Sequence, residues 1–274
     1  NIVQMWGNLA LDELGYAQVA WYQKQMKNKG THVTFNRVHS TLSHMYTIAR
    51  KMKLVDGNPI ADTNELKWKE EYRIRYLTLE ETAALIKACP NHLRPMVLTA
   101  LHTGMRKGEI LGLRLGEHVD LDSLNISLKA EETKGGKDRH IPINKTLLSV
   151  LKQVAMGKEA GDYIFSKPDG SPFVDVKRAF GSALKKAQIN GATFHTLRHT
   201  FASHLVMAGV DLYTVGDLLG HADYKQTQKY AHLSPDHRGR AVYFLDKIFS
   251  ETAPITNSIT KASQDALKVN NISQ

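Results

Sequence analysis

The sequence predicts a mainly α-helical protein with a small antiparallel β-sheet in its larger second part, preceded by a small all-α domain. Three observations lead to this fold class. Apolar residues recur at helical spacing through most of the chain. Between residues 125 and 143, apolar and polar residues instead alternate on both sides of a Gly-Gly pair. A polar, charge-mixed stretch over residues 61–76 separates the two parts.

Residues 1–60 are predicted to form the small helical domain, with its first helix missing. One helix is expected over residues 12–29, ending at Gly30. A second helix is expected after Thr34 as N-cap, and Asn58–Pro59 stops the pattern. Its predicted buried face consists of residues three and four apart: Val38, Leu42, Met45, Ile48 and Met52.

The second domain is predicted over residues 77–250, after a linker at 61–76. Thr78 and Glu81 have capping-box spacing and open its first helix. Alternating residues predict a hairpin or three-stranded meander with strands near 125–129 and 139–143, and 163–165 adds a short strand. Helical patterns follow at 146–156, 174–188, 196–208, 211–219, 224–231 and 236–249. Residues 251–274 form a polar C-terminal tail.

Composition limits the function classes. The chain has 274 residues, one cysteine (Cys89) and a net charge of +9 with a pI near 9.4. A single cysteine excludes an internal disulfide framework and any multi-cysteine metal site, and it fits a reducing cytosol. No apolar run approaches the roughly 18 residues of a membrane span, so no membrane partner is expected. The basic excess suits either a polyanion partner or a well-solvated basic surface.

Arg106 and Glu109 stand at the start of a predicted helix that follows Gly104. An arginine at this position reinforces the positive end of the helix dipole, which favours an anion site. The alternative is a surface Arg–Glu pair, which contributes little to stability.

His195, Arg198 and His199 form a second group on one predicted helix. His195 and Arg198 lie three residues apart and share a face, where a guanidinium suits a phosphate and an imidazole can move a proton. His195 and His199 also have the spacing of a metal-binding pair. Thr196 stands where that motif has its glutamate base, so no metal is predicted. His199 is interpreted as a structural histidine.

Two further segments hold a histidine and a tyrosine. In Leu218–His221, Gly220 ends a helix and His221 follows it. Within Thr227–Leu233, Tyr230 is by itself most simply a core or interface aromatic.

Taken in order from Thr103 to Leu233, these segments resemble the tyrosine recombinase (phage integrase) family. The family's catalytic set matches six positions of this sequence: Arg106, Lys134, His195, Arg198, His221 and Tyr230. Lys134 is preferred over Lys137 because the family's lysine precedes the turn. Lys137 and Arg139 are then expected as phosphate contacts or solvated turn charges. The resemblance makes the fold that of an α+β catalytic domain preceded by a helical, SAM-like core-binding domain, with no separate arm-binding domain.

The resemblance implies site-specific DNA cleavage and rejoining through a 3′-phosphotyrosine, without metal, ATP or any other cofactor. In it, Arg106 and Arg198 hold the scissile phosphate and His221 donates a hydrogen bond. His195 is the base for Tyr230, and Lys134 protonates the leaving 5′-oxygen. Type IB topoisomerase-like cleavage and rejoining and a catalytically inert DNA-binding or architectural relative are the alternatives.

The resemblance also implies partners. These are double-stranded DNA recombination sites in the bacterial cytosol or nucleoid, a homotetramer on DNA formed from monomers, and accessory DNA-bending proteins. The last predicted helix either docks on a neighbouring protomer or packs within its own domain, through Tyr243, Phe244, Ile248 and Phe249. Arg37, His39, Lys177 and Arg178 are candidates for reading bases.

Overall fold

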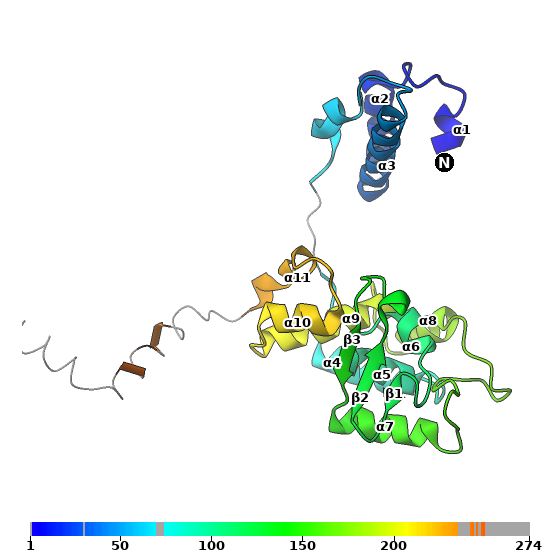
Figure 1. Cartoon of the computed structure of the whole chain (residues 1–274), viewed down its shortest axis with the longest axis vertical. Helices are drawn as coiled ribbons and strands as arrows, with labels where there is room; N and C mark the ends of the chain where they lie inside the picture. Colours follow the sequence, from blue (N-terminus) through cyan, green and yellow to red (C-terminus); the bar gives the residue numbers. More distant parts are fainter. Residues whose placement is uncertain are drawn as a thin grey trace, which may run out of the picture. The chain divides into compact units, whose positions relative to one another are not determined.

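The computed structural model describes residues 2–29, 31–69 and 74–234, and also residues 242, 243, 245, 248 and 249. The chain divides into two compact units, Asn1–Arg73 and Ile74–Gln274 (Figure 1). The tail predicted at 251–274 lies outside the described residues, as does most of the helix expected at 236–249. In the described part of the chain, no helix has the length and apolar character needed to cross a membrane.

The first unit is helical. Its elements are α1 (Ile2–Trp6), α2 (Tyr16–Asn28), α3 (His32–Lys51) and the 3-10 helix η1 (Ala61–Leu66). Helix α1 was not predicted, and α2 begins four residues later than expected because Gly15 is its N-cap. Helix α3 starts after Thr31 rather than Thr34 and ends well before Asn58–Pro59.

Helix α3 buries only part of the face that its aliphatic residues predict, since Leu42 is buried and Val38 packs against the core. Met45, Ile48 and Met52 are 37%, 45% and 64% exposed. The Tyr46 ring can be buried because its hydroxyl donates to the Leu11 carbonyl oxygen, 2.5 Å away. The rings of Phe35 and Tyr46, both fully buried, therefore decide which side of the helix faces the core. The buried face consists of residues spaced four and three apart: Phe35, His39, Leu42, Tyr46 and Ala49.

Part of the predicted linker belongs to this first unit. The Asn36 amide donates to the Trp68 carbonyl oxygen at 2.9 Å and accepts from the Trp68 backbone N–H at 3.1 Å. His39 is 1% exposed, and its Nε2 lies 2.8 Å from the Thr63 hydroxyl in η1. The prediction that His39 reads bases is therefore wrong, because its side chain cannot reach DNA. Arg37, Lys177 and Arg178 are exposed.

The second unit is mainly helical around a three-stranded antiparallel sheet of order β1-β2-β3, which confirms the predicted fold class (Figure 1). The strands form a meander in which Ile126 of β2 pairs with Ile141 of β3. The strand expected at 163–165 is a single bridge between Tyr163 and Arg114. The three strands and the short helix between the second and third are β1 (Val119–Asp120), β2 (Asn125–Leu128), η2 (Ala130–Glu132) and β3 (Arg139–Pro142).

Helices before and after the sheet build the core of this unit. The predicted capping box is present, since Thr78 and Glu81 each accept the other's backbone N–H. The helices before the sheet are α4 (Leu79–Ala88), α5 (Arg94–Thr103) and α6 (Lys107–Leu111). Those after it are α7 (Lys145–Ala155), α8 (Lys177–Lys186), α9 (Phe194–Met207), α10 (Leu212–Leu219), α11 (Lys225–Gln228) and η3 (Ala231–Leu233).

Candidate active site

Arg106 is placed by a tight turn between α5 and α6. Gly104 ends α5 in the left-handed conformation, with φ of 63°. A Cβ atom there would lie 2.4 Å from the Phe201 ring, so only glycine fits this turn. Arg106 stands at the start of α6, as predicted, where it is the N-cap, and its Nη1 donates to Glu109 Oε1 at 2.9 Å. The turn therefore fixes the backbone position from which the Arg106 side chain extends.

Arg198 comes from α9 and is held by two backbone carbonyls. Its Nη1 donates to the Gly104 oxygen at 2.8 Å and its Nη2 to the Leu219 oxygen at 2.7 Å. Only 3% of the residue is exposed. Burial, followed by the neighbouring charges of Arg106 and Arg139, lowers the pKa of Arg198 to about 10, so it remains protonated at neutral pH.

His221 follows Gly220, which ends α10 as predicted and has the left-handed conformation. Its Nδ1 lies 2.8 Å from the hydroxyl of Thr227. Thr227 can approach this closely because Gly216 faces it, and a Cβ on Gly216 would lie 2.8 Å from the same hydroxyl. Burial, followed by the charge of Arg198, lowers the pKa of His221 to about 3, so its imidazole is neutral at pH 7.

Five of the six predicted residues line one cavity of about 440 Å³: Arg106, Lys134, His195, Arg198 and His221. Lys134 lies in the turn between β2 and β3, and Gly135 beside it approaches the Gly220 carbonyl oxygen. Lys229 also lines the cavity and was not singled out from the sequence, although it directly precedes Tyr230. None of the lining residues is acidic. The cavity is therefore suited to an anion.

Tyr230 is the sixth predicted residue, and it does not line this cavity. It is 1% exposed and packs with apolar residues of α9 and α10. Its hydroxyl lies 2.6 Å from Nδ1 of His199, whereas His195 was the partner expected from the sequence. Burial raises the pKa of Tyr230 to about 12, although the charge of Arg198 opposes the shift. Burial, followed by the charge of Lys229, lowers the pKa of His199 to about 4.

Arg139 differs from its prediction as a phosphate contact or solvated turn charge. It is 5% exposed, and its Nη2 lies 2.7 Å from Glu109 Oε2. Side chains two residues apart in a strand point to the same face of the sheet. Arg139 therefore points inward together with Ile141. Burial alone would raise the pKa of Glu109, but Arg139 and the hydrogen bonds from Arg106 hold it below its usual range.

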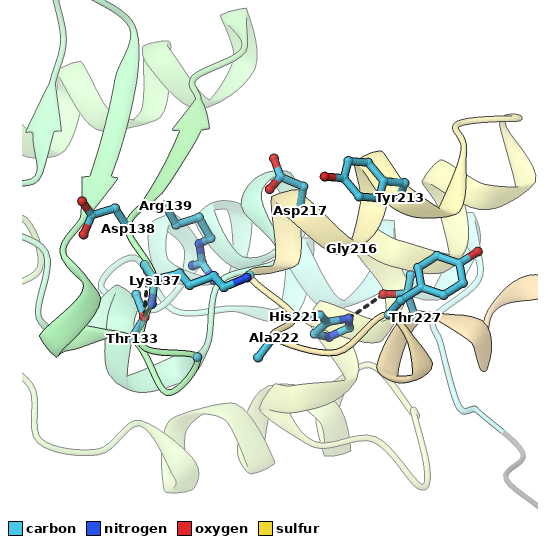
Figure 2. A pocket seen from close by; sticks show the side chains of 13 residues that line it. Thr133, Lys137, Asp138, Arg139, Tyr213, Gly216, Asp217, His221, Ala222 and Thr227 are labelled. Atoms are coloured by element: carbon cyan, nitrogen blue, oxygen red, sulfur yellow. Dashed lines mark hydrogen bonds between the residues drawn. The ribbon is translucent and has the colours of Figure 1, made fainter.

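A smaller cavity of about 270 Å³ adjoins the first, between the β2–β3 turn and α10. Figure 2 shows Lys137 and Arg139 on one side of it, with His221 and Thr227 on the other. Four residues line both cavities: Gly135, Gly220, His221 and Ala222.

One group of possible metal ligands occurs among the described residues. Ligand atoms of Glu117, His118 and Glu132 lie within 4.8 Å of one another. Both ring nitrogens of His118 have partners, because Nδ1 accepts from the Arg114 backbone N–H and Nε2 bonds to Glu132. These hydrogen bonds account for the cluster without an ion.

The chain belongs to the phage integrase family, whose family model matches residues 75–237. This match includes Tyr230 and all residues that line the 440 Å³ cavity, which we call the anion cavity. It confirms the resemblance drawn from the motifs. The chain is 31% identical to the integrase of Salmonella phage P22 over 237 residues, which cover 82% of this chain and 59% of that protein. It is also 31% identical to tyrosine recombinase XerC of Bacillus pumilus over 248 residues, which cover 82% of this chain and 79% of that protein.

A lambda integrase tetramer bound to a Holliday junction has a similar fold, with a TM-score of 0.69 and 23% identity. The match covers 84% of this chain and 68% of that chain. The chain spans 52% to 66% of the length of four phage relatives that it matches.

Proposed function

We propose that the chain is a site-specific DNA recombinase that cleaves and rejoins strands through a 3′-phosphotyrosine, without metal or ATP. The observation that carries this proposal is the cavity lined by two arginines, two lysines and two histidines, with no carboxylate among its lining residues. A transferring phosphoryl group carries negative charge on its non-bridging oxygens, and preorganised guanidinium groups stabilise that charge. Family membership supports the same reaction.

In this proposal Arg106 and Arg198 hold the scissile phosphate, and neutral His221 donates a hydrogen bond to it. The oxygen of Tyr230 attacks phosphorus while the bond from phosphorus to the 5′-oxygen breaks. His195 accepts the tyrosine proton, and Lys134 gives a proton to the departing 5′-oxygen. Attack by a 5′-hydroxyl from another strand reverses the step, so the phosphodiester energy is retained and no nucleotide is consumed.

Tyr230 must leave its buried position before it can attack. In the structure its hydroxyl contacts His199, and its pKa is raised, which makes it a poor nucleophile there. We therefore assign this conformation to a resting state. The same burial is the one observation that favours the inert DNA-binding alternative.

The proposed substrate is double-stranded DNA carrying a recombination site, on which four copies assemble. The tetramer of lambda integrase on a Holliday junction supports this assembly, as does the basic net charge of the chain. A cytoplasmic location and the help of DNA-bending proteins are part of the same proposal.

Covalent trapping tests the reaction. A duplex recovered from a random pool by binding to this chain, with a nick beside each candidate scissile phosphate, is incubated with the protein in chelator. We expect an SDS-resistant adduct from wild type and from Tyr213→Phe, whose exposed tyrosine on α10 is the matched control. Tyr230→Phe should give no adduct. Binding without an adduct from any variant supports the inert alternative, and relaxation of supercoils without strand exchange supports a topoisomerase.

A further inference from the structure

Arg139 begins β3, immediately after the turn that holds Lys134. Its Nη1 donates to the Leu219 carbonyl oxygen at 2.7 Å, and its Nη2 contacts Glu109 at the same distance. The guanidinium thus joins the sheet, the helix that follows Arg106, and the end of α10. Arg139 does not line the anion cavity.

Space for this guanidinium depends on Gly220. A Cβ atom on Gly220 would lie 2.7 Å from Nη1 of Arg139 and 2.8 Å from its Cδ. The glycine of the Leu-Gly-His segment therefore serves two purposes, since its left-handed backbone ends α10 and its missing side chain admits Arg139.

The contacts of Arg139 connect both predicted phosphate ligands. Glu109 accepts from Arg139 through Oε2 and from Arg106 through Oε1. The Leu219 oxygen accepts from Arg139 and also from Nη2 of Arg198. A continuous set of hydrogen bonds thus runs from Arg106 through Arg139 to Arg198.

We propose that Arg139 is a positioning residue that fixes the spacing of Arg106 and Arg198 without contacting DNA itself. The inference rests on the proposed function, because that spacing matters only if the two arginines bind one phosphate. The planar fork of arginine donates to a carbonyl from one nitrogen and to a carboxylate from another, whereas lysine has one donor nitrogen and cannot occupy both positions. A small displacement of groups that bind a transition state slows the reaction strongly.

The test compares Arg139→Lys with wild type in the trapping assay on the selected nicked duplex. Dissociation constant, single-turnover rate of adduct formation and thermal midpoint are measured for each protein. Arg114→Lys is the matched control, because Arg114 also forms a fork, to the Gly161 oxygen and the Tyr163 hydroxyl, away from the cavity. We expect Arg139→Lys to bind DNA like wild type and to form the adduct at least about tenfold more slowly. Arg114→Lys should react at the wild-type rate.

Equal rates of adduct formation for Arg139→Lys and wild type would overturn the inference and leave the proposed function standing. The same holds if Arg114→Lys slows adduct formation as much as Arg139→Lys does. No adduct from wild type would overturn both. If Arg139→Lys does not fold, the double variant Glu109→Gln/Arg139→Gln replaces it, because it removes both buried charges together. A wild-type rate in that variant also overturns the inference.

Discussion

The contact between His199 and Tyr230 makes a testable prediction about the resting state. Replacing His199 by phenylalanine keeps a ring beside Tyr230 and removes the nitrogen that lies 2.6 Å from its hydroxyl. Replacing His199 by asparagine instead retains a polar group at a similar distance from the backbone. The first variant should release Tyr230 and the second should hold it.

The magnitude follows from the burial of Tyr230, which is 1% exposed. A buried hydroxyl without a partner costs about 1–3 kcal/mol. If Tyr230 escapes that penalty by moving to solvent, the ratio of released to buried side chain rises by a factor of roughly 5 to 150. The phenol pKa, raised to about 12 in the buried position, should then fall toward its ordinary value near 10.

Carbon NMR of labelled tyrosine measures this change, since the Cζ shift follows ionisation of the phenol and Tyr230→Phe assigns the signal. We expect a lower Tyr230 pKa in His199→Phe and a value near wild type in His199→Asn. An unchanged pKa in His199→Phe, with unchanged thermal stability, would show that the hydrogen bond does not hold Tyr230 in place.

Three further predictions concern stability. His199 and His221 have pKa values of about 4 and about 3, below the 6.5 of an unfolded histidine, so the folded state binds fewer protons and loses stability as the pH falls below 6.5. After halving for partial exposure, we expect a loss of about 2 kcal/mol between pH 6.5 and 5 in urea unfolding followed by circular dichroism. A flat profile over that interval would contradict these shifts. Gly104→Ala should destabilise the second unit by about 2–4 kcal/mol, from left-handed strain and the contact with Phe201, measured as a lowered thermal midpoint. Asn58→Ala removes hydrogen bonds to Ser43 and to the backbone and should cost the first unit about 1–2 kcal/mol. Tryptophan fluorescence follows that loss because all three tryptophans lie in the first unit.

Features set by local chemistry could be predicted from the sequence. Gly104 and Gly220 end helices, and Arg106 stands at the start of the next helix after Gly104, because each of these positions depends on neighbours within a few residues. The meander around Gly135 followed from alternation. The full buried face of α3 could not be predicted in this way. Aliphatic spacing favoured Met45, whereas the Tyr46 ring is the one buried, with its hydroxyl bonded to the carbonyl oxygen of Leu11, 35 residues away.

Arg139 shows the same limit within the site. Its position in β3 pointed inward, but an arginine is seldom buried without a partner. That partner, Glu109, lies 30 residues earlier, and the second contact at Leu219 lies 80 residues later. The pairing of Tyr230 with His199 rather than His195 likewise depends on how α9 and the segment after α11 pack. Sequence spacing identified the chemical groups, but only tertiary contacts decide which of them meet.

The electrostatics of the cavity connect the resting state to the proposed reaction. Burial comes first in lowering the pKa of His195 and of His221, and the charge of Arg198 is the next contribution to each. The same guanidinium opposes the rise in the pKa of Tyr230. A phosphodiester bound between Arg106 and Arg198 would neutralise part of their positive charge. That neutralisation would raise the pKa of the nearby imidazoles, because a protonated imidazole would then be repelled less. Substrate binding would therefore make His195 a better proton acceptor at the stage when Tyr230 must lose its proton.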